Sequence, residues 1–241
     1  MAEIIPAILA KNYDDLKNKV AIMRGVAPII QVDICDGIYV PSRTWPFFTN
    51  ATQGTPFLDN SLDEHFTRIL NEEEGMPFWE DIDFELDLMV ADAVTNFDIY
   101  TKMGAKRIIF HLEAMQKKEE FRDFLEGIDM FVRDSMNIGV AINPLTPIEE
   151  IFSIIPFIDF VQCMGINREG FQGEVFDEKT LGNIKTLKQK FPEVKISVDG
   201  GVNMETAQKI IAAGADRLVA GSAIWNATNP HSALKDFENL S

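Results

Sequence analysis

The sequence predicts a single (β/α)8 barrel, and three observations point to this fold class. Short apolar runs of strand type alternate with helical runs almost throughout the 241 residues, which is about the length of one such barrel. Residues 195–222 read as strand, glycine turn, helix, strand and glycine turn, which is the pattern of a parallel βαβ unit. No Pro/Ser-rich linker interrupts the alternation. We therefore expect one domain over residues 1–241, with a long inserted loop at about 41–81.

Each of the eight expected strands is a short apolar run followed by a turn or a polar residue. They cover Glu3–Leu9, Pro28–Ile34, Ile82–Met89, Arg107–His111, Gly139–Ile142, Asp159–Cys163, Lys195–Asp199 and Leu218–Ala220. Helices are expected between and after them, at about Tyr13–Arg24, Asp92–Met103, Lys117–Ser135, from Thr146 onward, at Asp177–Lys190, between Asn203 and Gly214, and at Pro230–Glu238. In the helix after the seventh strand, Asn203 is the expected N-cap and Gly214 the expected stop.

The inserted loop is rich in aromatic residues and has one helical candidate, Asp63–Asn71. Its aromatic residues are Trp45, Phe47, Phe48, Phe57, Phe78 and Trp79. Loops of this length commonly cover a site or form an interface. We expect Trp45 and Phe47 to contact the mouth of the barrel or a neighbouring subunit, because exposed aromatic side chains would be unfavourable. Packing of these aromatics on the chain's own helices is the alternative.

Composition limits the class of partner and the compartment. A formal charge of −16 and a pI near 4.5 disfavour nucleic acids and anionic membranes as partners, but leave a small phosphorylated ligand open. The two cysteines, Cys35 and Cys163, form no framework of secreted type, which favours a reducing, cytoplasmic location. Glu3 and Pro6 interrupt the N-terminal apolar run that a signal peptide needs, and no run approaches transmembrane length.

Two glycine-rich turns follow the seventh and eighth predicted strands, which is where many barrels of this class bind phosphate. Exposed backbone N–H groups at the start of a helix attract anions, and no cluster of basic residues lies nearby in the sequence. We expect a phosphate group to be held mainly by backbone N–H groups of Gly173, Gly200, Gly201, Gly221 and Ser222. The alternative is that these glycines only tighten their turns.

Three carboxylates occur where predicted strands end. Side chains on one face of a strand recur at every second residue, so Gln31 shares a face with Asp33 on the second strand. Asp87 on the third strand and Asp199 on the seventh have equivalent positions, and all three carboxylates can point into the mouth of the barrel. Their mutual repulsion would raise a pKa or require a cation. Lys195 starts the seventh strand, so it belongs to the opposite end.

At these residues the chain resembles the ribulose-phosphate 3-epimerase family. The resemblance covers nearly the whole chain except the inserted loop, and its motifs are specific as a set although each is weak alone. They are IIPAILA at 4–10, QVDICDGIYVP at 31–41, LDLMV at 86–90, FHLEA at 110–114, AINPLTP at 141–147, GFQG at 170–173, VDGG at 198–201 and AGSAI at 220–224.

The resemblance implies epimerisation at carbon 3 of a ketose phosphate similar to ribulose 5-phosphate. One carboxylate removes a proton next to the carbonyl group to give an enediolate, and a second returns a proton to the opposite face. By resemblance Asp33 and Asp199 are this acid–base pair, Met89 and Met164 line the site, and Gly170 belongs to the substrate-binding loop. A divalent metal ion is implied as cofactor, a small phosphorylated sugar as partner, and a homo-oligomer as the assembly.

The chain departs from the family at several of these positions. Gln31 and Asp87 stand where the family usually has histidine ligands, and Ala7 and Ala10 where it has serines. Cys35 replaces a common methionine, and Arg168-Glu169 alters the loop after the sixth strand. The remaining ligand set, Gln31, Asp33, Asp87 and Asp199, offers only oxygen atoms, which favours Mg²⁺ or Mn²⁺ over Zn²⁺. The alternative is a site without metal, in which a protonated Asp87 donates a hydrogen bond to the enediolate.

The histidines are not expected to be ligands. His111 matches a family position but no ligand position, so we expect it to be packed or hydrogen-bonded. His65 and His231 lie outside the motifs and are expected on the surface.

Two other functions stay open. One is a non-catalytic or divergent sugar-phosphate-binding barrel, which the changed ligands allow although Asp33 and Asp199 are both present. The other is a related decarboxylase or aldolase. A decarboxylase of this type would carry Asp-x-Lys-x-x-Asp on the third strand, and a Schiff-base aldolase needs a lysine near the top of a strand. Neither lysine is present.

Overall fold

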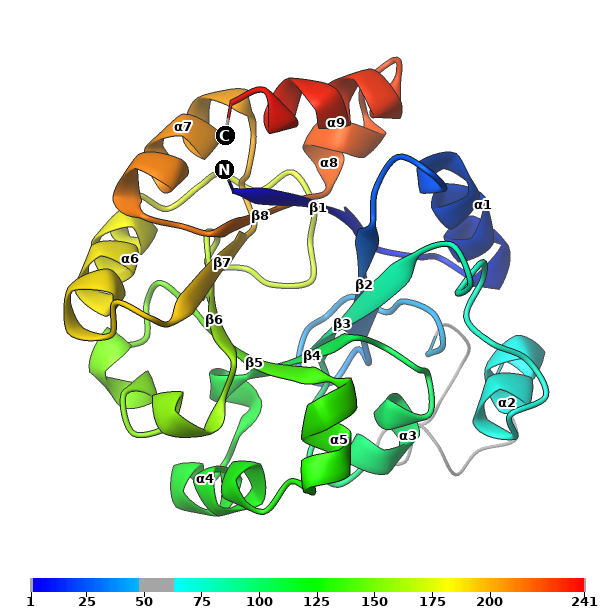
Figure 1. Ribbon diagram of the computed structural model, residues 1–241, viewed down its shortest axis with the longest axis horizontal. Helices are drawn as coiled ribbons and strands as arrows, with labels where there is room; N and C mark the ends of the chain where they lie inside the picture. Colours follow the sequence, from blue (N-terminus) through cyan, green and yellow to red (C-terminus); the bar gives the residue numbers. More distant parts are fainter. Residues whose placement is uncertain (1, 48–62, 241) are drawn as a thin grey trace.

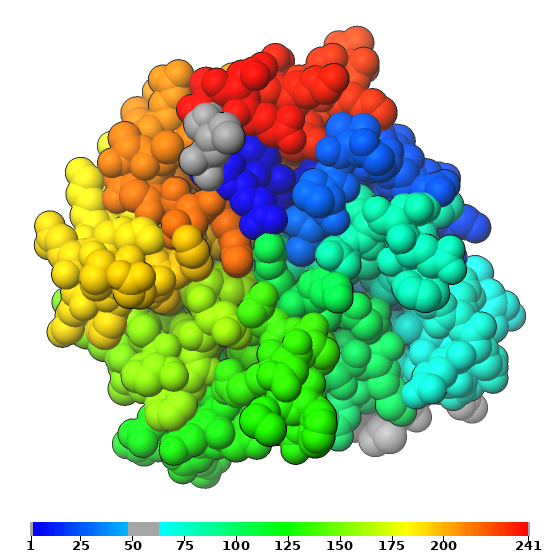
Figure 2. Space-filling view, viewed as in Figure 1, coloured from blue at the N-terminus to red at the C-terminus, as the bar shows by residue number. Residues whose placement is uncertain are grey.

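The computed structural model describes residues 2–47 and 63–240, and within them eight parallel strands form a closed barrel. The strands follow one another in sequence order, and β1 closes the ring by pairing with β8. Figure 1 shows the helices as a ring outside the strands. In Figure 2 the colours run around the molecule in sequence order, and the segments from its two ends lie side by side. The predicted (β/α)8 fold class is confirmed.

The strand boundaries agree with the expected ones to within two residues. They are β1 (Glu3–Ile8), β2 (Ile29–Cys35), β3 (Asp83–Met89), β4 (Arg107–His111), β5 (Asn137–Ile142), β6 (Phe160–Met164), β7 (Lys195–Asp199) and β8 (Arg217–Ala220). The strands are nearly continuous buried runs because both faces are covered, one by the helices and the other by the barrel interior.

The helices lie between the strands, with three short 3₁₀ turns. They are α1 (Tyr13–Met23), α2 (Glu64–Leu70), α3 (Phe97–Thr101), η1 (Leu112–Ala114), α4 (Lys118–Glu126), α5 (Met130–Ser135), η2 (Ile148–Ile151), η3 (Ile155–Phe157), α6 (Lys179–Lys190), α7 (Met204–Ala213), α8 (Ser222–Trp225) and α9 (Pro230–Glu238). Both predicted caps of α7 are present, since the Asn203 side chain accepts from two backbone N–H groups and Gly214 has φ of +111°. No helix within the described residues is long and apolar enough to cross a membrane.

Three helix predictions were wrong. The expected helix Lys117–Ser135 is two helices, because α4 ends at Gly127 and the Asp129 side chain caps a new helix, α5. Of the expected helix Asp92–Met103, only α3 is α-helical, and the residues before it form turns. The helix expected from Thr146 onward is replaced by η2 and η3, since Pro156 lacks the N–H that an α-helix would need.

The interior of the barrel is closed at the amino ends of the strands by four charged side chains and a phenylalanine. Arg107 forms ion pairs of 3.1 Å with both Glu3 and Glu85, and the Arg217 Nε atom lies 3.2 Å from Glu3. The Arg217 guanidinium covers the Phe160 ring at 4.6 Å. Gly139 pairs with Phe160 in the register of β5 and β6, and a Cβ atom there would lie 2.4 Å from that ring.

The expectation that Trp45 contacts the barrel mouth or another subunit is wrong. Trp45 is fully buried, with its ring 5.8 Å from that of Tyr13 in α1 and 5.6 Å from that of Phe66 in α2. Phe47 is 3% exposed and belongs to the same core, so these aromatics anchor the inserted segment on its own subunit. Phe48 and Phe57 lie outside the described residues.

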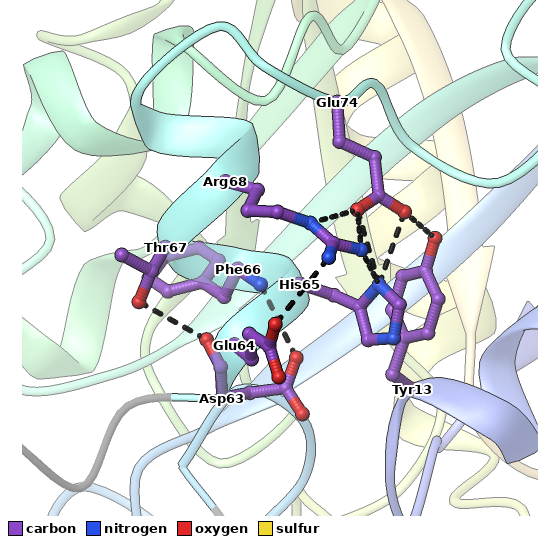
Figure 3. A network of polar contacts seen from close by, with 8 residues as sticks. All are labelled: Tyr13, Asp63, Glu64, His65, Phe66, Thr67, Arg68 and Glu74. Carbon is purple, nitrogen blue, oxygen red and sulfur yellow. Dashed lines mark hydrogen bonds and ion pairs between the residues drawn. The ribbon is translucent and has the colours of Figure 1, made fainter.

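A polar network fastens α2 to α1 from the outside (Figure 3). The Glu74 carboxylate accepts a hydrogen bond of 2.7 Å from the Tyr13 hydroxyl and one of 2.8 Å from Arg68 Nε. It also lies 3.0 Å from His65 Nδ1, and the His65 ring stacks on Tyr13 with 3.7 Å between centroids. His65, which was expected on the surface, is therefore partly buried and takes part in this network. His231 is also only partly exposed, and its Nε2 atom contacts the backbone carbonyl of Ile22.

Candidate active site

Three carboxylates from β2, β3 and β7 meet at the carboxyl end of the barrel. Asp33 and Asp87 are direct neighbours in the register of β2 and β3, and Asp199 ends β7. One oxygen atom of each of the three lies within 4.8 Å of one oxygen atom of each of the others. Asp33 is 6% exposed and Asp87 is fully buried. The convergence expected from strand alternation is present.

Gln31 connects two of these carboxylates. Its Nε2 atom donates hydrogen bonds of 2.8 Å to both Asp33 Oδ1 and Asp199 Oδ2. Its Oε1 atom is buried and has no hydrogen-bond partner. Gln31 and Asp87 therefore lie together with Asp33 and Asp199, so all four proposed metal ligands are in one cluster.

The cluster carries more negative charge than its surroundings can stabilise. Burial, followed by the charges of Asp199 and Asp87, raises the pKa of Asp33 well above its usual value. Burial and the charge of Asp87 raise the pKa of Asp199 to about 7. Near neutral pH the cluster therefore either retains a proton or requires a cation.

The donor atoms of this cluster fit a divalent cation. Three carboxylates provide hard oxygen ligands, and the unpaired buried Oε1 of Gln31 is a fourth, since rotating the amide group by 180° exchanges its oxygen and nitrogen. A bound cation would also offset the repulsion that adds to burial in raising the two pKa values. The residues present could therefore hold a divalent metal ion.

His111 lies behind Asp87 and links it to the loop after β6. Its Nε2 atom is 2.8 Å from Asp87 Oδ1, and its Nδ1 atom is 3.2 Å from Glu169 Oε2. Burial alone would lower the pKa of His111, but the charges of Asp87 and Glu169 raise it well above its usual value. Burial opposes ionisation of Glu169, but His111 and two hydrogen bonds lower the pKa of this carboxyl group to about 2. His111 is packed and hydrogen-bonded, as expected.

Sequence reasoning missed the partners of Glu169. The Tyr39 hydroxyl donates a hydrogen bond of 2.5 Å to this carboxylate, and Asn143 Nδ2 donates one of 2.9 Å. The only sequence signal was that Arg168-Glu169 departs from the family pattern. That departure revealed a changed loop but not its contacts.

A cavity of about 240 Å³ opens above the carboxylates. All eight residues expected to bind substrate line it, namely Met89, Met164, Gly170, Gly173, Gly200, Gly201, Gly221 and Ser222. Asp33 and Asp199 face it, whereas Gln31 and Asp87 are not part of its lining. Phe171 and Gln172, which were not predicted, also line it. No lysine or arginine does so within the described part of the chain.

The glycine turns bring the backbone close to this cavity. Gly201 has φ of +67°, and a Cβ atom there would lie 2.7 Å from Phe176 Cα, so a side chain would be both strained and obstructed. The α7 helix follows directly, with its N-cap Asn203 two residues after Gly201 and its first residue at Met204. The turns therefore have the geometry of an anion cradle.

The closed barrel, with its acidic cluster and cavity at the carboxyl ends of the strands, has the architecture of a (β/α)8 enzyme. The chain matches the ribulose-phosphate 3 epimerase family over residues 3–225, and it belongs to that family. It is 28% identical to the ribulose-phosphate 3-epimerase of Schizosaccharomyces pombe over 239 residues, covering 99% of this chain and 93% of the relative. It is 30% identical to the Bacillus subtilis ribulose-phosphate 3-epimerase over 243 residues, covering 98% of each.

Solved structures share the fold at lower identity. One is a 3-hexulose-6-phosphate synthase with a TM-score of 0.65 and 18% identity, covering 99% of both chains. At this identity the similarity supports the fold alone.

Proposed function

We propose that this protein catalyses epimerisation at carbon 3 of a pentulose phosphate such as ribulose 5-phosphate. The family supports this reaction, and one observation in this chain supports it most directly. Asp33 and Asp199 approach the cavity from strands on different sides of the barrel, and the same amide group of Gln31 binds both.

The two carboxylates have the properties that a two-base epimerisation requires. At the start one must be ionised to remove the proton from carbon 3, and the other must be protonated to deliver a proton to the opposite face. Their raised pKa values support a pair that shares a proton near neutral pH. After turnover the two roles are exchanged. When no cation is bound, the Gln31 amide N–H group holds both side chains in place.

A divalent cation, Mg²⁺ or Mn²⁺ rather than Zn²⁺, is the proposed cofactor, with Gln31, Asp33, Asp87 and Asp199 as its ligands. When bound, it would stabilise negative charge on the enediolate oxygens. The alternative without metal relies on hydrogen bonding from the protein to the enediolate. Metal analysis of protein purified without chelators, followed by chelation and add-back, separates the two. Full activity after chelation would exclude a role of the metal in catalysis. A tightly held Zn²⁺ would show that the oxygen-only ligand set does not determine which ion is bound.

The phosphate group of the substrate is proposed to lie at the glycine turns, against Gly173, Gly200, Gly201, Gly221 and Ser222. Because no lysine or arginine among the described residues lines the cavity, backbone N–H groups would supply most of the binding. A crystal soaked in sulfate or phosphate should show an anion between these turns. An anion found only at surface lysines would count against the site.

The reaction is tested by incubating the protein with a panel of pentulose and hexulose phosphates in deuterated water. Epimerisation should introduce deuterium at the carbon next to the carbonyl group, and the preferred member of the panel identifies the sugar. No exchange with any member, with or without added metal, would instead support a sugar-phosphate-binding barrel without catalytic activity.

A decarboxylase or aldolase is less well supported. Neither β3 nor the described lining of the cavity contains the lysine that such enzymes would use. Release of carbon dioxide or aldol cleavage in the same panel would reverse this preference.

A homo-oligomer and a cytoplasmic location complete the proposal. Ile38, Leu145 and Val175 follow β2, β5 and β6, and each is at least 48% exposed, which supports a contact between copies near the mouth. Light scattering after size exclusion would give the number of subunits. Cys35 and Cys163 are buried and unpaired, which fits a reducing compartment.

A further inference from the structure

A second group of possible metal ligands lies beside the catalytic cluster but outside it. His111 ends β4, Glu113 lies in η1, and Glu169 lies in the loop after β6. One ligand atom of each is within 4.8 Å of the others. A separate pocket, lined by residues that include Tyr39, Glu113, Asn143 and Glu169, opens next to them.

The His111 ring is held as metal-binding histidines usually are. Its side chain is fully buried, and Nε2 is fixed by the Asp87 carboxylate at 2.8 Å. The Nδ1 atom forms an ion pair of 3.2 Å with Glu169 Oε2, a contact that lacks the geometry of a hydrogen bond. When no metal is bound, the positive charge of this pair is a proton on the ring, and a metal ion bound to Nδ1 and Glu169 would replace that proton. A carboxylate on the far ring nitrogen is the usual outer support of a metal-bound imidazole.

The two carboxylates are also held by outer hydrogen-bond donors. Glu169 accepts from the Tyr39 hydroxyl and from Asn143 Nδ2. Glu113 Oε1 accepts from the backbone N–H of Asn143 at 2.8 Å. No lysine or arginine forms an ion pair with either carboxylate in the part of the chain that the structure describes. Arg168, next to Glu169, instead lies 3.7 Å from Glu174 and covers the Phe171 ring.

We propose that His111 Nδ1, Glu113 and Glu169 form a second divalent-cation site, with water completing the coordination. One imidazole and two carboxylates suit Mn²⁺, Fe²⁺ or Zn²⁺ better than Mg²⁺. This site differs in chemistry from the oxygen-only cluster of Asp33, Asp87 and Asp199. The two sites are connected by the hydrogen bond between His111 and Asp87.

The position of the site gives it a consequence for the cavity. Glu169 immediately precedes Gly170, and the same loop continues to Gly173, which belongs to the proposed phosphate cradle. A cation bound to Glu169 and His111 fixes one end of this loop to the end of β4. It therefore stabilises the loop in the position in which Gly170 and Gly173 line the cavity.

The test counts and locates bound ions. Equilibrium dialysis with Mn²⁺, which suits both ligand sets, should give two ions per chain, and crystals soaked in Mn²⁺ should show anomalous peaks at both clusters. Glu113→Gln should retain the ion at the aspartate cluster and weaken binding at the second site by at least about tenfold, since a lost ligand should matter no less than a lost outer partner. Glu113 is exposed, so this variant should fold with an unchanged melting temperature.

A matched control is Glu149→Gln, an exposed glutamate outside both clusters, which should still bind two ions. A single peak at Asp33, Asp87 and Asp199 would overturn the second site and leave the proposed epimerase function intact. Two ions retained by Glu113→Gln with unchanged affinity would equally overturn the ligand set.

Discussion

Both ends of the barrel interior are charged, but only one end is balanced. At the amino ends of the strands two arginines, Arg107 and Arg217, face two glutamates, Glu3 and Glu85. At the carboxyl ends three aspartates meet around a neutral amide, and the nearest basic group, His111, is shared with Glu169. The balanced end needs nothing from solution. The acidic end requires a bound proton or a bound cation. This is the condition expected of a site that transfers protons and binds a cation.

Balanced charges do not by themselves make the ion pairs at the amino ends of the strands stabilising. Burial raises the pKa of Glu85 to about 7 even though Arg107 lies 3.1 Å away. Desolvation of a buried pair can exceed the attraction within it, so such pairs are most costly when one member is removed. The two ends should therefore respond in opposite ways to substitution.

The largest expected effect is on activity at the acidic end. Asp33→Asn and Asp199→Asn should each lower kcat by about 10²–10⁴-fold, because each removes one of the two groups that transfer protons. Phosphate affinity should change little, and the free energy of unfolding should not fall, because a buried carboxylate with a raised pKa is removed. Each variant could still exchange one proton with deuterated water from its remaining side. Near-normal turnover in either would contradict the assignment.

Arg107→Met should have the opposite signature. It leaves Glu85 buried without its partner, so the free energy of unfolding should fall by about 3–5 kcal/mol while kcat per folded molecule stays constant. Denaturant titration together with steady-state kinetics measures both quantities. The double variant Arg107→Met/Glu85→Leu is the control and should recover much of the loss. A large fall in kcat would show that the two ends are coupled.

The pH dependence of stability should differ between metal-free and metal-bound protein. A carboxyl group whose pKa is raised on folding stabilises the fold below its unfolded pKa, and this stabilisation is lost as pH rises through the folded value. For Asp199 that window is from about 4 to about 7. The loss should be roughly 2–3 kcal/mol in chelated protein, less than the full effect of the shift because the aspartates share their protons.

Thermal melts across this pH range, with and without Mg²⁺ or Mn²⁺, test this expectation. A bound cation should flatten the dependence, and Asp199→Asn should flatten it without metal. An identical slope in all three samples would show that the cluster does not govern stability.

The smallest effect is expected outside the barrel, in the network around Glu74. Glu74→Gln should lower the free energy of unfolding by about 1 kcal/mol, since partly exposed ion pairs and hydrogen bonds contribute little. Burial opposes the ionisation of Glu74, but hydrogen bonds from Tyr13, Arg68 and His65 lower its pKa to about 2. Its contribution is therefore present above about 4.5 and lost as pH falls toward 2. Activity should be unaffected, and a changed KM would imply that α2 acts on the mouth.

Sequence reasoning captured what depends on local periodicity. The alternation of strand and helix predicted the barrel, and the two-residue period within β2, β3 and β7 predicted that Asp33, Asp87 and Asp199 converge. It failed where a helix is interrupted, and where a contact between residues far apart in the sequence determines the structure. Gly127 divides a helix that charge patterning alone would continue. Trp45 is buried against Phe66, which comes much later in the same inserted segment.

The least predictable part of the site is the contact between His111 and Glu169. The two residues are far apart in the sequence, and no period or motif joins them. They meet only because β4 and β6 both end at the same mouth of the barrel, which places His111 Nδ1 3.2 Å from Glu169 Oε2. An unusual residue pair in a motif, here Arg168-Glu169, can indicate where such a contact occurs but does not identify the residue on its other side.

The contact between Gly139 and Phe160 has an evolutionary consequence. The ring of Phe160 occupies the space that a side chain at position 139 would need, because a Cβ atom at Gly139 would lie 2.4 Å from that ring. Arg217 in turn covers that ring. The two positions therefore form an epistatic pair: a larger residue at 139 becomes acceptable only after Phe160 has become smaller. A lineage of this protein could exchange the residue that fills the bottom of the barrel, but only by passing through a less stable intermediate.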